Sequence, residues 1–145
     1  MTRVSLICLL FVALISFSCQ EKKDENLESF LEFYDQFHQD TAFQMAHIDF
    51  PLEGLPSGAD SLFASNEKFY WQKEDWEFHQ KIEFEYSEFT QNLQFFSEDL
   101  LVEKIVHNTG SYGMMRRFAK YDGEWYLIYY AGPNRLKPKP QIFID

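Results

Sequence analysis

Two adjacent arginines, Arg116 and Arg117, are the residues whose types and spacing best suit chemistry in this chain. They lie within the stretch SYGMMRRFAKYDGEWYLIYYAG, which covers residues 111–132. Successive side chains of a strand point to opposite faces of a sheet, so each face would receive one guanidinium group. A buried arginine needs a carboxylate partner or an anionic ligand. Arg116 therefore has three interpretations, which are an internal salt bridge, a position at an exposed edge, and a ligand contact.

The ligand interpretation places Arg116 beside Trp125 and Tyr129 as a candidate pocket. Aromatic faces combined with one cation can hold an anionic or sugar-like molecule. The alternative is that these aromatic rings fill the core of the domain. The same three residues are thus the candidate binding site and a candidate piece of the core.

The common catalytic motifs are missing from the sequence. It contains no glycine-rich phosphate loop, no G-x-S-x-G, no H-E-x-x-H and no EF-hand spacing. No two histidines are two to four residues apart, so we expect no local metal site and no cofactor. A carboxylate pair assembled by the fold remains an alternative for acid–base work. We therefore favour a noncatalytic domain that binds a partner or helps assembly, and keep an isomerase or dehydratase as the enzymatic alternative.

The N-terminus predicts export and lipidation. Arg3 precedes an apolar run over 4–17 that is shorter than the roughly 20 residues of a membrane-spanning helix. The sequence Ile15-Ser16-Phe17-Ser18-Cys19 resembles a bacterial lipoprotein signal, which implies removal of residues 1–18 and lipidation of Cys19. Secretion with an unmodified Cys19 is the alternative. Acyl chains contribute about 0.8 kcal/mol per buried CH₂, so a multiply acylated Cys19 would anchor the protein in a membrane.

Residues 19–25 combine the lipidation site with a charged tether. One interpretation of this run, from its composition, is a flexible tether. The other is based on its resemblance to the signal that sends some lipoproteins to the cell surface. We therefore expect an outer-membrane lipoprotein of the bacterial cell envelope, with surface exposure as the further alternative. The formal net charge of −10 argues against nucleic-acid binding.

Residues 26–145 predict one α+β domain with N-terminal helices on a curved antiparallel sheet. Asn26 is the expected N-cap of a first helix, and Asp40 that of a second helix over 40–47. The first helix carries an apolar stripe of Leu27, Phe30, Leu31, Tyr34 and Phe37, with Phe33 at its edge. Strands are expected over 69–71, 82–86, 100–107, 112–121 and 124–131, with a short extended piece over 48–54, an undecided segment over 88–98, and a docked edge strand over 142–144.

Asp122-Gly123 is a hairpin turn signal between the last two long strands. Counting outward pairs Phe118 with Leu127 and Arg116 with Tyr129, and Pro133 should end the pairing soon afterwards. The hairpin is apolar on both faces, so each face must be covered. We therefore expect a homodimer through the face that carries Tyr126, Ile128 and Tyr130.

The order of elements resembles the cystatin-like cone of the nuclear-transport-factor-two superfamily. Three stretches resemble, more closely, an uncharacterised bacterial lipoprotein family, domain of unknown function 4348. The stretches are Phe30-x-x-Phe33-x-x-x-Phe37, Asp40-x-x-Phe43-Gln44-x-x-His47-Ile48-x-Phe50-Pro51-Leu52 and Phe118-x-x-Tyr121-Asp122-Gly123-x-Trp125-x-Leu127. The resemblance implies a fold and a lipid anchor, and it implies no catalytic residues.

Overall fold

The computed structural model describes residues 25–59 and 68–136. Its contacts divide the chain into two compact units, Met1–Asp35 and Gln36–Asp145. The predicted signal peptide over 1–18, Cys19, the tether before residue 25 and the predicted edge strand over 142–144 lie outside the described residues. The single domain over 26–145 stays a prediction.

A helix covers residues 25–37, so Asn26 is already inside it and is not its N-cap. The buried side chains are Phe30, Phe33, Tyr34 and Phe37, whereas Leu27 and Leu31 are 38% and 44% exposed. The apolar stripe is therefore centred further along the helix than predicted, and Phe33 belongs to its middle. The i, i+3, i+4 spacing brings the Phe30 ring to 6.1 Å from Phe33 and 5.7 Å from Tyr34, measured between centroids.

The second helix, α2 (Thr41–Ala46), begins as predicted. The side chain of Asp40 accepts a hydrogen bond from the backbone N–H of Phe43 at 3.0 Å, which is the geometry of an N-cap. After α2, Ile48 forms a parallel bridge with Leu127. Strand β1 (Leu52–Leu55) starts directly after Pro51, where a missing N–H is tolerated.

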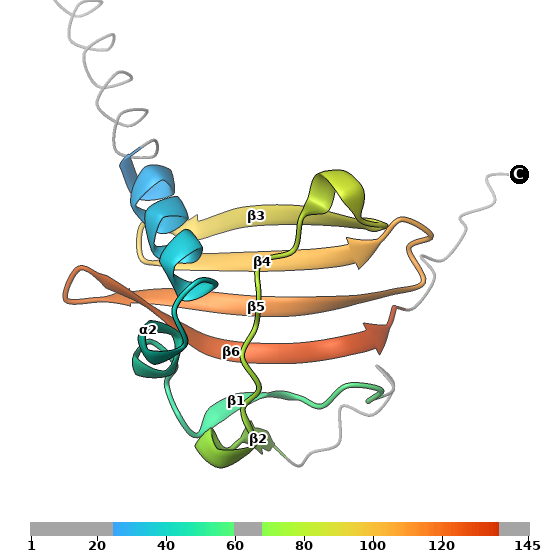
Figure 1. Cartoon of the computed structure of the whole chain (residues 1–145), viewed down its shortest axis with the longest axis horizontal. Helices are drawn as coiled ribbons and strands as arrows, with labels where there is room; N and C mark the ends of the chain where they lie inside the picture. Colours follow the sequence, from blue (N-terminus) through green and yellow to red (C-terminus); the bar gives the residue numbers. More distant parts are fainter. Residues whose placement is uncertain (1–24, 60–67, 137–145) are drawn as a thin grey trace, which may run out of the picture. The chain divides into compact units, whose positions relative to one another are not determined.

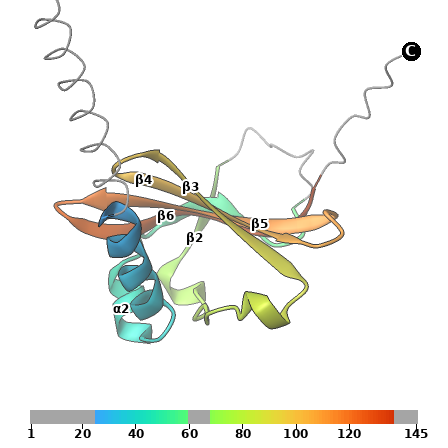
Figure 2. The same ribbon diagram turned by 90° about the horizontal axis from the view of Figure 1, so that it is seen from above.

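Six strands form one sheet in the order β2-β1-β6-β5-β4-β3. Strands β3 (Phe89–Ser97), β4 (Leu100–His107), β5 (Tyr112–Tyr121) and β6 (Glu124–Arg135) form an antiparallel meander (Figure 1). Strand β2 (Phe69–Trp71) pairs antiparallel with β1, but β1 runs parallel to β6. The α+β class is confirmed, while the sheet is mixed and not wholly antiparallel, because the meander of β3 to β6 ends with β6 beside β1 and in the same direction. Figure 2 shows that the sheet is strongly twisted.

The predicted strand over 82–86 is wrong. Phe84–Tyr86 form a short 3-10 helix, η2, and Tyr86 is 85% exposed. Residues 76–83 link it to a first 3-10 helix, η1 (Lys73–Asp75), and we call this link the strap. The strap crosses β6, β5 and β4 (Figure 1), so it has no neighbouring strand with which to pair. Figure 2 shows the strap and α2 on the same side of the sheet, which we call the inner face.

The hairpin pairs as predicted only near its turn. Phe118 faces Leu127, but the next pair is Arg117 with Tyr129, so Ile128 is an extra residue in β6. This β-bulge shifts the alternation of the β6 residues that follow it by one, as far as the next irregularity. A second shift, between Gly113 and Met115, accommodates Pro133 and lets β6 continue to Arg135, beyond its predicted end.

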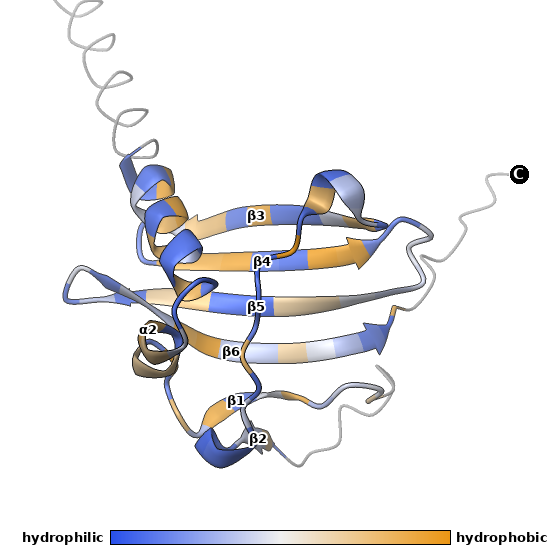
Figure 3. Ribbon diagram, in the orientation of Figure 1, coloured by the Kyte–Doolittle hydropathy of each residue, from blue (hydrophilic) through white to orange (hydrophobic). Residues whose placement is uncertain are grey.

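Hydropathy along the sheet marks the region of interest. Figure 3 shows β4 as largely apolar but interrupted near its middle by a hydrophilic stretch, which lies beside a hydrophilic stretch of β5. Glu103 and Arg116 are paired across these two strands at that point.

Candidate functional site

A buried ion pair occupies the middle of the inner face. The Nε of Arg116 donates to the Oε2 of Glu103 at 2.5 Å, and their side chains are 3% and 0% exposed. The Nε2 of Gln91 donates to the other carboxylate oxygen at 2.6 Å. Both charges are therefore compensated, which is the condition for placing them inside a protein.

His38 contacts the other side of the arginine. Its Nε2 lies 2.7 Å from Nη1 of Arg116, and the imidazole is buried. A guanidinium group has donors and no acceptor, so Nε2 must be the acceptor and the proton of the neutral ring must be on Nδ1. The adjacent Phe37 packs edge-on against Phe118, with 5.9 Å between ring centroids, and this contact holds the segment against β5.

Gln44 of α2 fastens the strap. Its Nε2 donates to the carbonyl oxygens of Phe37 and His79 at 2.8 and 3.0 Å. Its Oε1 accepts from the Trp76 indole N–H and from the His79 backbone N–H, both at 3.0 Å. A fully buried amide thus makes four hydrogen bonds, and it fixes the position of His79 over the sheet.

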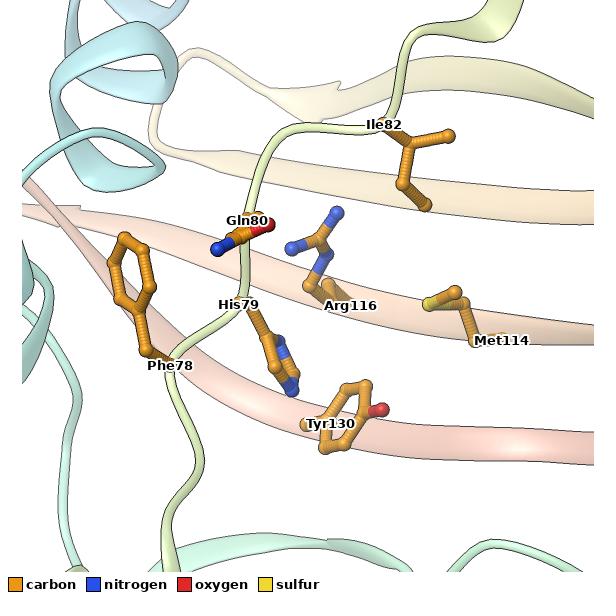
Figure 4. A pocket seen from close by; sticks show the side chains of 7 residues that line it. All are labelled: Phe78, His79, Gln80, Ile82, Met114, Arg116 and Tyr130. Carbon is orange, nitrogen blue, oxygen red and sulfur yellow. The ribbon is translucent and has the colours of Figure 1, made fainter. Parts of the chain in front are cut away.

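A pocket of about 210 Å³ opens between the strap and the sheet. The strap contributes Phe78, His79, Gln80 and Ile82, β5 contributes Met114 and Arg116, and β6 contributes Tyr130 (Figure 4). The pocket is smaller than the roughly 300–1,000 Å³ of sites for drug-sized ligands. It is therefore suited to a molecule of about one ring.

Two ring side chains of the pocket carry polar atoms that have no hydrogen-bond partner within the part of the chain that the structure describes. Among the residues that the structure describes, neither the imidazole nitrogens of His79 nor the hydroxyl of Tyr130 makes a hydrogen bond. The two rings lie 4.7 Å apart between centroids, and Trp76 lies 4.4 Å from His79. These groups are available to water or to a ligand.

Both groups are uncharged at neutral pH, and burial favours this state. Burial lowers the pKa of His79 from 6.5 to about 3, and the nearby charge of Arg116 adds to this effect. Burial also raises the pKa of Tyr130 above its usual value of 10.0, with Arg116 acting in the opposite direction. The pocket therefore contains a neutral imidazole, with one donor and one acceptor nitrogen, beside an un-ionised phenol.

The residues predicted for the pocket are separated by the structure. Arg116 lines it, but Tyr129 lies on the outer face, where the Arg117 guanidinium sits 4.4 Å from the centre of its ring. Trp125 is buried on the inner face near the hairpin turn, with Lys120 Nζ 5.4 Å from its ring centre, and it does not line the pocket. The bulge at Ile128 is the physical reason, because it places Tyr130 opposite Arg116.

The same shift divides the predicted dimer face. Tyr126 stays on the outer face, where its ring contacts Tyr121 at 5.8 Å between centroids, and Ile128 is half-buried. Tyr130 is 7% exposed and turned toward His79, so it cannot belong to an outer surface together with Tyr126.

Several pocket residues escaped the sequence analysis. His79 has no other histidine within four residues, Phe78 lies in a charged segment without regular periodicity, and Ile82 belongs to the wrongly predicted strand over 82–86. Met114 is two residues before Arg116 and shares its face by alternation, which indicates its position but not its role. Among residues 25–59 and 68–136, no cluster of three or more histidine, cysteine or acidic side chains suits a metal ion. None of the helices in these same ranges has both the length and the apolarity to span a bilayer.

Several solved structures are similar to this chain. A cystatin-like protein from Bacteroides caccae matches with a TM-score of 0.51 and 20% identity, covering 71% of this chain and 74% of that chain. An NTF2-like protein from Bacteroides fragilis matches with a TM-score of 0.49 and 15% identity, covering 70% of this chain and 45% of that chain. An NTF2-like protein from Cytophaga hutchinsonii has a TM-score of 0.42 and 10% identity, over 79% and 98% of the two chains.

The match to the first of these structures shows a cystatin-like α+β fold, as the order of elements predicts. At 20% identity it concerns the fold alone. No protein-family model matches the sequence, and no curated protein matches it significantly. Membership of the lipoprotein family with domain of unknown function 4348 therefore stays a prediction from the motifs.

Proposed function

We propose that this protein is a lipid-anchored protein of the bacterial cell envelope whose α+β domain binds a small molecule without transforming it. The observation that carries the binding role is the pocket under the strap, where His79 and Tyr130 present polar groups that no described residue satisfies. Polar atoms that line a concave site and have no partner in the protein are available to water or to a ligand.

The chemistry of the lining favours binding over catalysis. The seven lining residues include no carboxylate, and the nearby Glu103 is held by Arg116 and Gln91. General acid–base catalysis works best with a group whose pKa is near the working pH. His79, with a pKa lowered to about 3, is a weak base at neutral pH. An isomerase or dehydratase activity therefore has less support than binding.

A thermal-shift screen with small sugars, carboxylates and phosphates tests the binding role. A ligand at 100 times its Kd stabilises the folded state by about 2.7 kcal/mol, which gives a readable rise in Tm. Met114→Phe should abolish the rise by filling the pocket. Met115→Phe is the matched control, since the next residue of β5 points to the outer face. Failure of every compound, or equal binding by both variants, would reject the pocket.

The anchor is supported by the N-terminal sequence. Cys19 follows the apolar run and is the lone cysteine outside the predicted signal peptide, because Cys8 lies within it. Metabolic labelling with a fatty acid in a bacterial host should label the wild type and Cys8→Ala, but not Cys19→Ala. Labelled protein in the outer-membrane fraction would support the proposed location, and protease treatment of whole cells would test surface exposure. Unlabelled wild-type protein would contradict the anchor.

Association through the outer face is a second candidate role. Tyr121 and Phe96 are 51% and 61% exposed, and Tyr126 and Ile128 are half-buried. Exposed aromatic groups often mark contact surfaces. We propose a homodimer in which Ile128 is central. Sedimentation should show a dimer for the wild type and a monomer for Ile128→Asp, and a wild-type monomer at high concentration would end the proposal.

A further inference from the structure

We propose that the pocket selects a neutral, hydroxylated ring of the size of one monosaccharide and discriminates against the matching acid. This inference rests on the proposed binding function and specifies its ligand class. It chooses between the anionic and the sugar-like molecules that the sequence left open.

The first argument is the balance of charge around the pocket. Arg116 is the one formally charged residue in its lining, and its Nε is bonded to the fully buried carboxylate of Glu103. The ion pair has no net charge, so it attracts an anion much less than a single arginine would. The chain as a whole carries a formal charge of −10, which further disfavours the approach of an acid.

The second argument is the kind of hydrogen-bonding group on offer. The neutral ring of His79 presents one donor and one acceptor, and the hydroxyl of Tyr130 is both at once. A carboxylate is an acceptor only, so it would leave the acceptor nitrogen of the imidazole without a donor. A sugar hydroxyl donates and accepts, so it can satisfy each of these groups in turn.

The third argument is shape. Phe78, Ile82 and Met114 supply an apolar wall, and Tyr130 adds an aromatic face (Figure 4). A pyranose ring combines apolar C–H faces with a rim of hydroxyls, which matches an apolar wall beside polar groups. The volume of about 210 Å³ restricts the occupant to about one ring.

The test compares neutral sugars with their own acids. Purified protein carrying ¹³C-methyl methionine is titrated with glucose, galactose and N-acetylglucosamine, and with glucuronate and galacturonate. The Met114 methyl resonance, assigned with Met114→Leu, reports on the pocket. At least one neutral sugar should shift this resonance saturably, and its uronate should bind at least about tenfold more weakly.

Two neighbouring tyrosines supply a matched pair of variants. Tyr130→Phe removes the hydroxyl from the pocket and should weaken sugar binding by about tenfold. Tyr129→Phe makes the same change on the outer face and should leave the affinity unchanged. The methyl glycoside and a disaccharide of the best sugar then distinguish a free monosaccharide from the end of a glycan.

The outcomes separate this inference from the proposed function. Tighter binding of a uronate, or of a neutral ring without hydroxyls, would overturn the inference and leave a small-molecule pocket in place. No saturable shift of the Met114 resonance by any compound would overturn both. A loss of affinity that is equal in Tyr129→Phe and Tyr130→Phe would remove the pocket as the site of binding.

Discussion

Arg116 donates a hydrogen bond to His38, with 2.7 Å between Nη1 and Nε2. Because the arginine cannot accept, this contact determines which nitrogen of His38 carries the proton. The same guanidinium donates to Glu103 through its Nε, so one side chain of β5 joins β4 to the segment that precedes α2. The polar centre of the inner face is thus a continuous chain of contacts.

Removing the charge of Arg116 from these contacts should lower the free energy of unfolding. Arg116→Met leaves the carboxylate of Glu103 buried without its counterion, and breaking such a pair costs about 3–5 kcal/mol. Arg117→Met is the control, because that residue is exposed and its contact with Tyr129 is of the kind that contributes about 0.5–1 kcal/mol. Urea unfolding of both variants gives the comparison, and similar losses would show that the ion pair has no special role.

The amide of Gln44 should be equally hard to replace. Gln44→Leu leaves buried backbone groups of Phe37 and His79 without partners, for an expected loss of about 2–4 kcal/mol. The same change at the exposed Gln94 of β3 should alter the unfolding free energy by less than about 0.5 kcal/mol. A Gln44→Leu variant as stable as Gln94→Leu would mean that the strap is held by other contacts.

The free energy of unfolding should decrease as the pH falls below neutrality, in part because of His79. Its pKa is about 3 in the folded state against 6.5 in the unfolded chain, so between these values the unfolded state binds more protons. The contribution of His79 is complete above pH 6.5 and is lost progressively as the pH falls toward 3.

Replacing His79 by glutamine should therefore flatten the dependence of unfolding free energy on pH between 6.5 and 4, relative to the wild type. One proton per molecule corresponds to a slope of about 1.4 kcal/mol per pH unit. The ring resonances of His79 offer a direct check, since they should not titrate between pH 8 and 5. A titration near pH 6 would contradict the buried neutral state.

Gly54 should tolerate no side chain. A Cβ at this position would overlap the Tyr130 carbonyl oxygen, which is backbone and cannot turn aside. We expect Gly54→Ala to cost about 3 kcal/mol, at the upper end for overpacking, and to disturb the parallel pairing of β1 with β6. Gly58→Ala is the comparison, since its Cβ would meet open space and only the positive φ of 74° costs energy, about 1 kcal/mol. Equal losses in urea unfolding would argue against this register.

The sequence was sufficient to predict those elements of the fold that have a local signal. Asp40 has a cap geometry that depends on three residues, and Asp122-Gly123 turns a hairpin whose nearest pairs follow by counting. The sequence also predicted β4 and β5 with their observed bounds. The α+β class followed from helices placed before a meander, and the cystatin-like fold followed from the resemblance of this order of elements to that superfamily.

What escaped prediction depends on contacts between distant residues. The apolar alternation of Ile82, Phe84 and Tyr86 resembles a strand, yet the strap crosses the sheet and has no strand beside it. Gln44 and His79 are far apart in the sequence, and their hydrogen bonds, which build the roof of the pocket, have no local signature. The bulge at Ile128 has no signal in the sequence either. This one extra residue places Tyr130 at the site in place of the predicted Tyr129.

That bulge makes the pocket insensitive to the loss of one residue. Deletion of Ile128 would remove the extra residue, so Tyr129 would still face Arg117 and Tyr130 would still face Arg116. Loss of the bulge in a chain of unchanged length would instead place Tyr129 opposite Arg116. Because both residues are tyrosines, a phenol would remain opposite Arg116 in either case, whereas the following residues Ala131, Gly132 and Pro133 have no duplicate.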